Sequence, residues 1–309
     1  MTGECKVYEI VVPNSESYFY HFVEKNMTPE NVGAGRGDLV IEIKHAIWDL
    51  ETLERQGQLD ESKRQLLARL RDLYEKEHYV EAYCLLKGYK SALVLRDGLE
   101  EVVFNVSEDQ VRKIEQEINS YLGTIMKALD ALPYGDEKIE FVHECYRLHS
   151  LDKERCLEEA KRILSEGRAR AQRAGELVER MGIFSIWAID VPDARTYAEY
   201  ARPAAMWYNV FSIPDLRERV YIMLNDPKWG EDYRRMLESH GLLDKLNNVV
   251  GLTKAYMLIR GYPAALLLRD PRGEDHWMVA FLLDPISVDI AIRDIERHLK
   301  QADRRALPA

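Results

Sequence analysis

Two side chains near the start of the sequence could act together in hydrolysis. Glu42 and Lys44 stand two positions apart in the run DLVIEIK, which covers residues 38–44. If this run is a β-strand, both side chains lie on one face, because successive side chains of a strand point to opposite faces.

Glu42 and Lys44 resemble the Glu-x-Lys pair of the restriction-like and RecB-like nucleases. The resemblance implies metal-dependent cleavage of nucleic acid, in which the carboxylate binds the metal ion and the lysine helps to activate the attacking water. Those enzymes also need an aspartate on a neighbouring strand, whereas Asp38 would lie only about 13 Å away along the same strand. A helix that begins at Asp38 fits the run better, because it places apolar residues on one face. These residues are Leu39, Ile43, Ala46, Ile47, Leu50 and Leu53.

A second pattern that could bind metal ions is Glu-x-x-His. A Glu and a His at positions i and i+3 reach one metal ion from one helix face, as in ferritin-like di-metal bundles. The pattern occurs at Glu42 and His45, at Glu75 and His78, and at Glu140 and His143. No further glutamate stands out on an apolar face to complete such a site. We therefore predict no metal site.

The glycine-rich run GAGRG, residues 33–37, is the nearest approach to a cofactor motif. It lacks the Lys-Ser/Thr ending of a phosphate-binding loop and does not fit the dinucleotide-binding pattern. We interpret it as a flexible connection and predict no cofactor.

A basic helix could contact nucleic-acid phosphates. Residues 151–181 are predicted to form a helix with an apolar stripe. Beyond this stripe, arginines alternate with alanines. They are Arg168, Arg170, Arg173 and Arg180. Glutamates lie among them, which favours a solvent-exposed face with salt bridges. Nucleic-acid binding by this helix is kept as an alternative.

The elements that would position all these residues are repeated along the chain. The stretch YCLLKGYKSALVLRD, residues 83–97, recurs as YMLIRGYPAALLLRD, residues 256–270, with nine of fifteen positions identical. Each copy predicts a helix that ends at a glycine, Gly88 or Gly261, followed by a short buried strand. In the first copy this helix is expected to begin at Asp60 and to continue to Gly88. A second strand and a capped helix follow in both copies, and Ser107 with Gln110 fits a capping box in the first.

The repeat extends upstream, since residues 7–13 (VYEIVVP) resemble residues 186–192 (IWAIDVP) and each run is followed by a helix-capping residue, Asn14 or Asp193. We predict an α+β protein that is a tandem duplication of a β-α-αα-β-β-α unit. The predicted boundaries are 1–132 for the first unit, 133–182 for a helical connector and 183–309 for the second unit.

Polar and aromatic residues shared by both copies are the predicted binding residues. They are Tyr89, Arg96 and Asp97 in the first copy and Tyr262, Arg269 and Asp270 in the second. One interpretation is a pair of pseudosymmetric surfaces that each offer an arginine and a tyrosine to a ligand or partner. The other is that the tyrosine anchors the hairpin and the Arg-Asp pair satisfies groups of the turn.

Composition narrows the class of protein. The net charge of −10 argues against binding nucleic acid over the whole surface, and no apolar run is long enough to span a membrane. The first residues, MTGECKVYE, do not resemble a signal peptide either, so a cytoplasmic location is expected. The four cysteines form no CxxC pair, and in a reducing compartment they are expected to be free thiols. The abundance of Glu and Arg would suit a thermophilic organism.

The function predicted from these features is a non-catalytic binding or scaffold protein with a protein partner. The alternatives are a metal-dependent nuclease with one degenerate unit, which uses Glu42 and Lys44, and a nucleic-acid-binding factor that uses the basic central helix.

Overall fold

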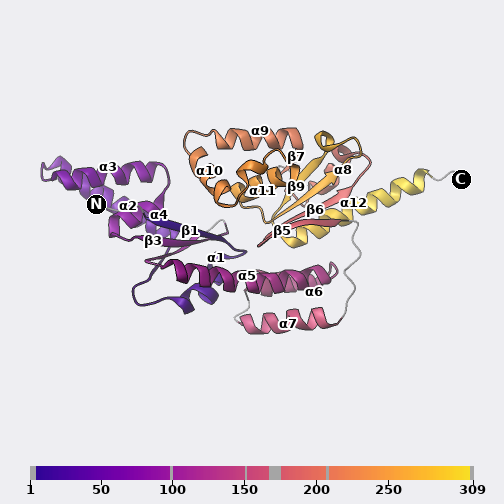
Figure 1. The fold of residues 1–309 in the computed structure, drawn as a ribbon, viewed down its shortest axis with the longest axis horizontal. Coiled ribbons are helices and arrows are strands. Elements are labelled where there is room, and N and C mark those ends of the chain that lie inside the picture. Colours follow the sequence, from indigo (N-terminus) through magenta and orange to yellow (C-terminus); the bar gives the residue numbers. More distant parts are fainter. Residues whose placement is uncertain (1–4, 98–99, 150–151, 167–174, 207–208, 307–309) are drawn as a thin grey trace. The chain divides into compact units, whose positions relative to one another are not determined.

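The protein is a helix-rich α+β chain that divides into two compact units, Met1–Tyr121 and Leu122–Ala309 (Figure 1). The structure is a computed structural model that describes residues 5–97, 100–149, 152–166, 175–206 and 209–306. In these residues no helix is both long and apolar enough to cross a membrane.

The first unit is built on a four-stranded sheet with the order β1-β3-β4-β2. Its strands are β1 (Lys6–Val11), β2 (Val32–Gly35), β3 (Ser91–Arg96) and β4 (Glu100–Phe104). Strand β1 is parallel to β3, and the other pairings are antiparallel. Its helices are α1 (Ser15–Tyr18), α2 (Arg36–Arg55), α3 (Glu61–Glu75), α4 (Tyr79–Lys87) and α5 (Glu108–Ala131), which continues into the second unit.

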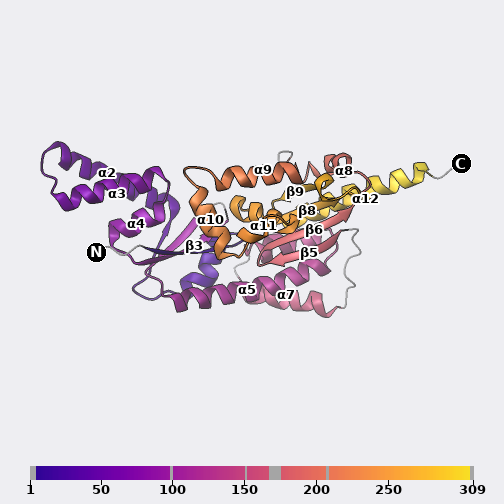
Figure 2. The same ribbon diagram turned by 45° about the horizontal axis from the view of Figure 1, so that its top comes forward.

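One face of this sheet packs against α2 and α4, and α3 packs on these two helices and lies beside α2 (Figure 2). Leu39 and Ile43 of α2 are buried in this core, as the helical pattern predicts. Asp60 caps α3 by accepting a hydrogen bond from the Lys63 amide, and Ser107 and Gln110 form the predicted capping box of α5.

The second unit contains a five-stranded sheet with the order β5-β6-β8-β9-β7. Its strands are β5 (Glu176–Met181), β6 (Phe184–Asp190), β7 (Val210–Ser212), β8 (Ala264–Arg269) and β9 (Met278–Leu282). Its helices are α6 (Asp136–Phe141), α7 (Lys153–Ser165), α8 (Ala194–Ala201), α9 (Ile213–Leu224), α10 (Gly230–Ser239), α11 (Val249–Arg260) and α12 (Pro285–Ala306). Helices α8 and α12 share an apolar core with one face of the sheet, and α11 contacts the other face.

The four strands of the first sheet match four strands of the second, β6, β8, β9 and β7, in order and direction, and the parallel pairs match in register. Lys6 pairs with Ser91 in the first ladder, and Ser185 pairs with Ala264 at the corresponding step of the second. Both ladders are parallel and six pairs long, and each continues into an antiparallel hairpin. A duplicated unit would produce this agreement, and the duplication itself stays our interpretation.

Both helices that precede the central strands end in the predicted way. Gly88 and Gly261 adopt the left-handed conformation, with φ of 75° and 74°. Glycine is favoured there because it has no Cβ to clash with the backbone.

Three local predictions differ from the structure. The GAGRG run is not simply a flexible connection, because Val32–Gly35 forms β2 and pairs with β4. The helix expected to continue from Asp60 to Gly88 is interrupted at residues 76–78, where Glu77 has a φ of 61°. The helix expected over residues 151–181 ends at Ser165, and residues 176–181 form β5 instead.

The prediction of free thiols is wrong. Cys5 is bonded to Cys84 in the first unit, and Cys145 to Cys156 in the second. The Cα atoms of the two pairs are 6.0 and 5.4 Å apart, which is an ordinary separation for a disulfide. Sequence spacing could not reveal either bond, because the partners meet only in the folded chain.

Candidate binding site

A hollow of about 730 Å³ lies at the carboxyl ends of the parallel strands β6 and β8. Ligands of open α/β sheets commonly bind at this end of the strands. The lining residues are Asp190, Val191, Pro192, Arg269, Asp270, Pro271 and Trp277. Two of the six predicted binding residues, Arg269 and Asp270, therefore line one hollow.

Arg269 is held in place by carboxylates of two neighbouring strands. Its Nε lies 2.7 Å from Oδ1 of Asp190 on β6, and its guanidinium also lies 3.1 Å from Glu176 on β5. In the first unit, Arg96 also contacts a carboxylate on the parallel strand, at 3.1 Å from Glu9 on β1, although Glu9 and Asp190 are not matching positions. Each arginine therefore links the two parallel strands of its sheet.

Asp97 and Asp270 each accept a hydrogen bond from a backbone amide at the start of a helix. Asp97 accepts a 2.8 Å hydrogen bond from the Ser15 amide at the first turn of α1. Asp270 accepts a 3.0 Å hydrogen bond from the Ala194 amide at the first turn of α8. Each aspartate thus satisfies a backbone donor that the helix itself leaves unpaired.

Asp270 also pairs with an arginine two residues further along the chain. Arg272 donates to both of its carboxylate oxygens, at 2.8 and 2.7 Å. This pairing, together with the amides of Ala194 and Arg272, lowers the pKa of Asp270 well below its usual range. The stabilisation is fully present above the pKa of an unfolded aspartate, about 3.9, and is lost as the pH falls below it.

We expect Asp97→Ala to lower the free energy of unfolding by about 1 kcal/mol, because it removes a helix-capping acceptor. Asp270→Ala should cost more, because it also releases Arg272. Thermal unfolding measured from pH 7 down to pH 3 checks both expectations. The deficit of Asp270→Ala should shrink as the solution is acidified, and a deficit that is constant over this range would contradict the account.

The two predicted tyrosines belong to matching aromatic clusters. Tyr89 stacks on Phe104 at 5.1 Å, and Tyr262 lies 5.6 Å from Phe281 at the corresponding place. The helix tyrosines Tyr83 and Tyr256 complete the clusters, and the Tyr262 hydroxyl donates to Asn209.

The tyrosine and the arginine of each copy stand at opposite ends of one strand. Tyr262 precedes the first residue of β8, and Arg269 is its last residue. Seven residues of extended chain span roughly 20 Å, so one small ligand does not reach both side chains. The binding role of the six residues stays a prediction, and the contacts described here are ones that the fold itself uses.

Glu42 and Lys44 lie on helix α2, not on a strand. Residues two positions apart on a helix do not face each other, so the geometry of the Glu-x-Lys pair is absent here. Glu42 contacts Lys87 at 2.6 Å and accepts a hydrogen bond from the Tyr83 hydroxyl at 3.2 Å. The contact with Lys87 is the main reason that the pKa of Glu42 is lowered.

Within the described part of the chain, no group of three or more His, Cys, Asp or Glu side chains could hold a metal ion. Arg168, Arg170 and Arg173 lie outside the described residues. Arg180 is on strand β5, where its guanidinium contacts Asp130 at 3.0 Å.

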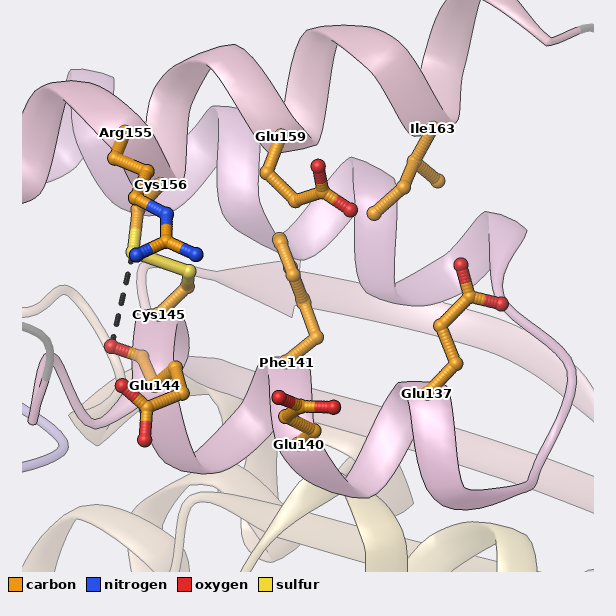
Figure 3. Close-up of a pocket in the computed structure, with 9 residues that line it drawn as sticks. All are labelled: Glu137, Glu140, Phe141, Glu144, Cys145, Arg155, Cys156, Glu159 and Ile163. Carbon is orange, nitrogen blue, oxygen red and sulfur yellow. Dashed lines mark hydrogen bonds between the residues drawn. A yellow bond between two sulfur atoms is a disulfide. The ribbon is translucent and has the colours of Figure 1, made fainter.

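A second hollow, of about 310 Å³, lies between α7 and the helical segment that starts with α6 (Figure 3). The Cys145–Cys156 disulfide and the Phe141 ring line it together with five charged residues. These are Glu137, Glu140, Glu144, Arg155 and Glu159. An acidic lining favours cations over anions, so this hollow does not suit nucleic-acid phosphates.

The most exposed large apolar side chains on α2 and α9 were not predicted from the sequence. Trp48 and Ile41 on α2 are 62% and 56% exposed, and they stand seven residues apart on one helix face. Tyr221 and Ile222 on α9, which follows β7 as α2 follows β2, are 68% and 59% exposed. The sequence pattern of α2 could have revealed Trp48, because its apolar face is already filled by Leu39 and Ile43.

No protein-family model, no curated protein and no solved structure matches this chain. Its function therefore has to be argued from its own residues.

Proposed function

We propose that the chain is a non-catalytic binding or scaffold protein that contacts protein partners through both of its units. The observation that carries the proposal is the exposure of Trp48 and Ile41 on α2 and of Tyr221 and Ile222 on α9. Tryptophan and tyrosine are enriched among the residues that dominate protein–protein binding energy. Large exposed apolar side chains that share a surface commonly mark interaction sites.

The repeated polar residues have structural contacts of their own. Asp97 and Asp270 cap helices, and Arg96 and Arg269 link strands. These contacts give both units a structural reason to keep the residues, and their role in binding stays a prediction. The apolar helix surfaces differ in sequence between the units, as expected if each unit contacts its own part of a partner.

The test is capture of cross-linked partners from extracts of the source organism. Wild type is compared with Ile41→Glu/Trp48→Glu and with Tyr221→Glu/Ile222→Glu. Tyr20→Glu is the matched control, because Tyr20 is also exposed but lies on another element. A partner that is retained by the control and lost from either double variant supports the proposal.

Once such a partner is purified, Trp48→Ala should weaken its binding by about 30-fold, which corresponds to about 2 kcal/mol for a dominant contact. Titration calorimetry measures this change. Affinity that is unchanged in Trp48→Ala and in both double variants would argue against the proposed surfaces.

The cytoplasmic location is also kept as a proposal. Two disulfides are ordinary in oxidising compartments and also occur inside the cells of hyperthermophiles. The second setting agrees with the Glu- and Arg-rich composition.

A further inference from the structure

The two sheets differ at one edge. In the second unit, β5 pairs antiparallel with β6 and covers the side of β6 that faces away from β8. In the first unit, β1 corresponds to β6, and no described strand occupies the corresponding position. In the second unit this edge is therefore covered by an antiparallel strand, whereas the described residues of the first unit place no strand beside the same edge of β1.

The outward-facing backbone groups of β1 can be identified from its pairing with β3. The amides of Lys6 and Val12 donate to carbonyls of the chain that carries β3, at 3.0 and 2.8 Å. Because peptide groups alternate along a strand, the amides of Val7, Glu9 and Val11 point to the open edge. In β6, the corresponding residues of Val7 and Glu9 are Ile186 and Ala188, and both are paired with β5.

The other described sheet edges carry features that discourage pairing. Strand β7 has three residues, and β2 has four, two of which are glycines. Strand β5 has a register irregularity between Leu177 and Glu179. Short strands and bulges are known ways of blocking edge-to-edge association. Strand β1 has neither, because its six residues pair with β3 in an uninterrupted register.

The charges on β1 are already neutralised within the first unit. Lys6 contacts Glu108 at 3.2 Å, and Glu9 contacts Arg96 at 3.1 Å. Neither side chain therefore presents an uncompensated charge that would repel an incoming strand.

We propose that β1 is a dimerisation strand, which pairs antiparallel across a two-fold axis with β1 of a second copy of this chain. A strand that pairs with its own copy about a two-fold axis normal to the sheet is necessarily antiparallel, which is the orientation that β5 has on β6. The pairing joins two four-stranded sheets into one, as in other cases of strand addition at an edge. It does not depend on the apolar helix surfaces of the proposed function.

The register of the pair follows from the side chains. Pairing centred on Glu9 would set two glutamates directly opposite each other, which is destabilising. Pairing centred on Tyr8 sets Tyr8 opposite Tyr8, Val7 opposite Glu9 and Lys6 opposite Ile10. No like charges then face each other, so the dimer uses the register centred on Tyr8.

The test compares Glu9→Pro with Glu9→Ala by sedimentation across a micromolar concentration series, the range expected for a small interface. Both variants lose the contact with Arg96, but only proline removes the outward amide and leaves the ladder to β3 intact. Wild type and Glu9→Ala should form dimers. Glu9→Pro loses one hydrogen bond per copy, so its association should weaken by about 10- to 100-fold.

Three outcomes would overturn the proposal: a wild-type chain that stays monomeric, equal weakening of the dimer in both variants, or a Glu9→Pro dimer that associates as tightly as wild type. Hydrogen exchange of the wild-type protein decides the matter if Glu9→Pro fails to fold. The backbone amides of Val7, Glu9 and Val11, which point away from β3, should exchange more slowly as the protein is concentrated. If none of them slows, β1 is not the dimer contact.

Discussion

Lys138→Met is expected to lower the free energy of unfolding by about 3 to 5 kcal/mol, because it removes the cation that faces a buried carboxylate. The Lys138 ammonium on α6 lies 2.7 Å from Asp289 on α12, and the two side chains are only 2% and 4% exposed. Removing one member leaves the other charge in a region that water does not reach. Urea unfolding at neutral pH measures the loss.

Two further variants separate the buried pair from an ordinary surface pair. The double change Lys138→Met/Asp289→Leu should recover most of the lost stability, because both charges are then gone. Lys76→Met breaks a pair whose side chains are 48% and 59% exposed, so it should cost at most about 0.5 kcal/mol. A Lys138→Met protein as stable as Lys76→Met would show that the buried pair does not hold α6 to α12.

Cys5→Ser/Cys84→Ser is expected to cost about 4 kcal/mol, and Cys145→Ser/Cys156→Ser about 3 kcal/mol. The two disulfides close chain segments with sequence separations of 79 and 11 residues. A longer closed loop removes more conformational freedom from the unfolded chain, so the first bond should stabilise more. Unfolding without reductant measures both changes.

The wild-type protein with added reductant is the control for these variants, and it should match the loss of both bonds. Denatured wild type that has not been reduced should show no reactive thiols. Four titratable thiols, or stability that reductant does not alter, would contradict the pairing. The thiol count also bears on the cytoplasmic proposal. Free thiols would be the ordinary state in a reducing compartment.

The parts of the fold that short sequence signals specify were predictable. Asn14, Asp60 and Asp193 cap helices as their positions indicated, and Gly88 ends α4. Each acts through hydrogen bonds or backbone angles within a few residues of itself, so the neighbouring sequence contains the necessary information.

The missed elements depend on contacts with distant residues. Strand β2 reads VGAG, which has little strand propensity, and it forms because β4 offers a partner. Strand β5 reads ELVERM, a composition that suits a helix, and it forms because β6 lies beside it. In both cases tertiary pairing overrides local preference.

For the same reason, only two of the seven residues that line the candidate site were predicted. Repetition identified Arg269 and Asp270, because both units use them. It could not identify Asp190 or Trp277 as their neighbours in the hollow, since these residues come from other elements and differ from their counterparts in the first copy. The exposed Trp48 and Tyr221 are not repeated at matching positions, so repetition gave no signal for them.

The strand pairings of the two units also differ in how soon they can form during synthesis. Strand β6 follows β5 after a short turn, with Met181 opposite Phe184, so it has a partner as soon as it emerges from the ribosome. Lys6 of β1 must wait for Ser91, which is 91 − 6 = 85 residues later. At about 5 to 20 residues per second, that delay is roughly 4 to 17 s. During this interval the nascent β1 has both edges unpaired and Cys5 has no partner, so the first sheet and its disulfide are completed only late in translation of the first unit.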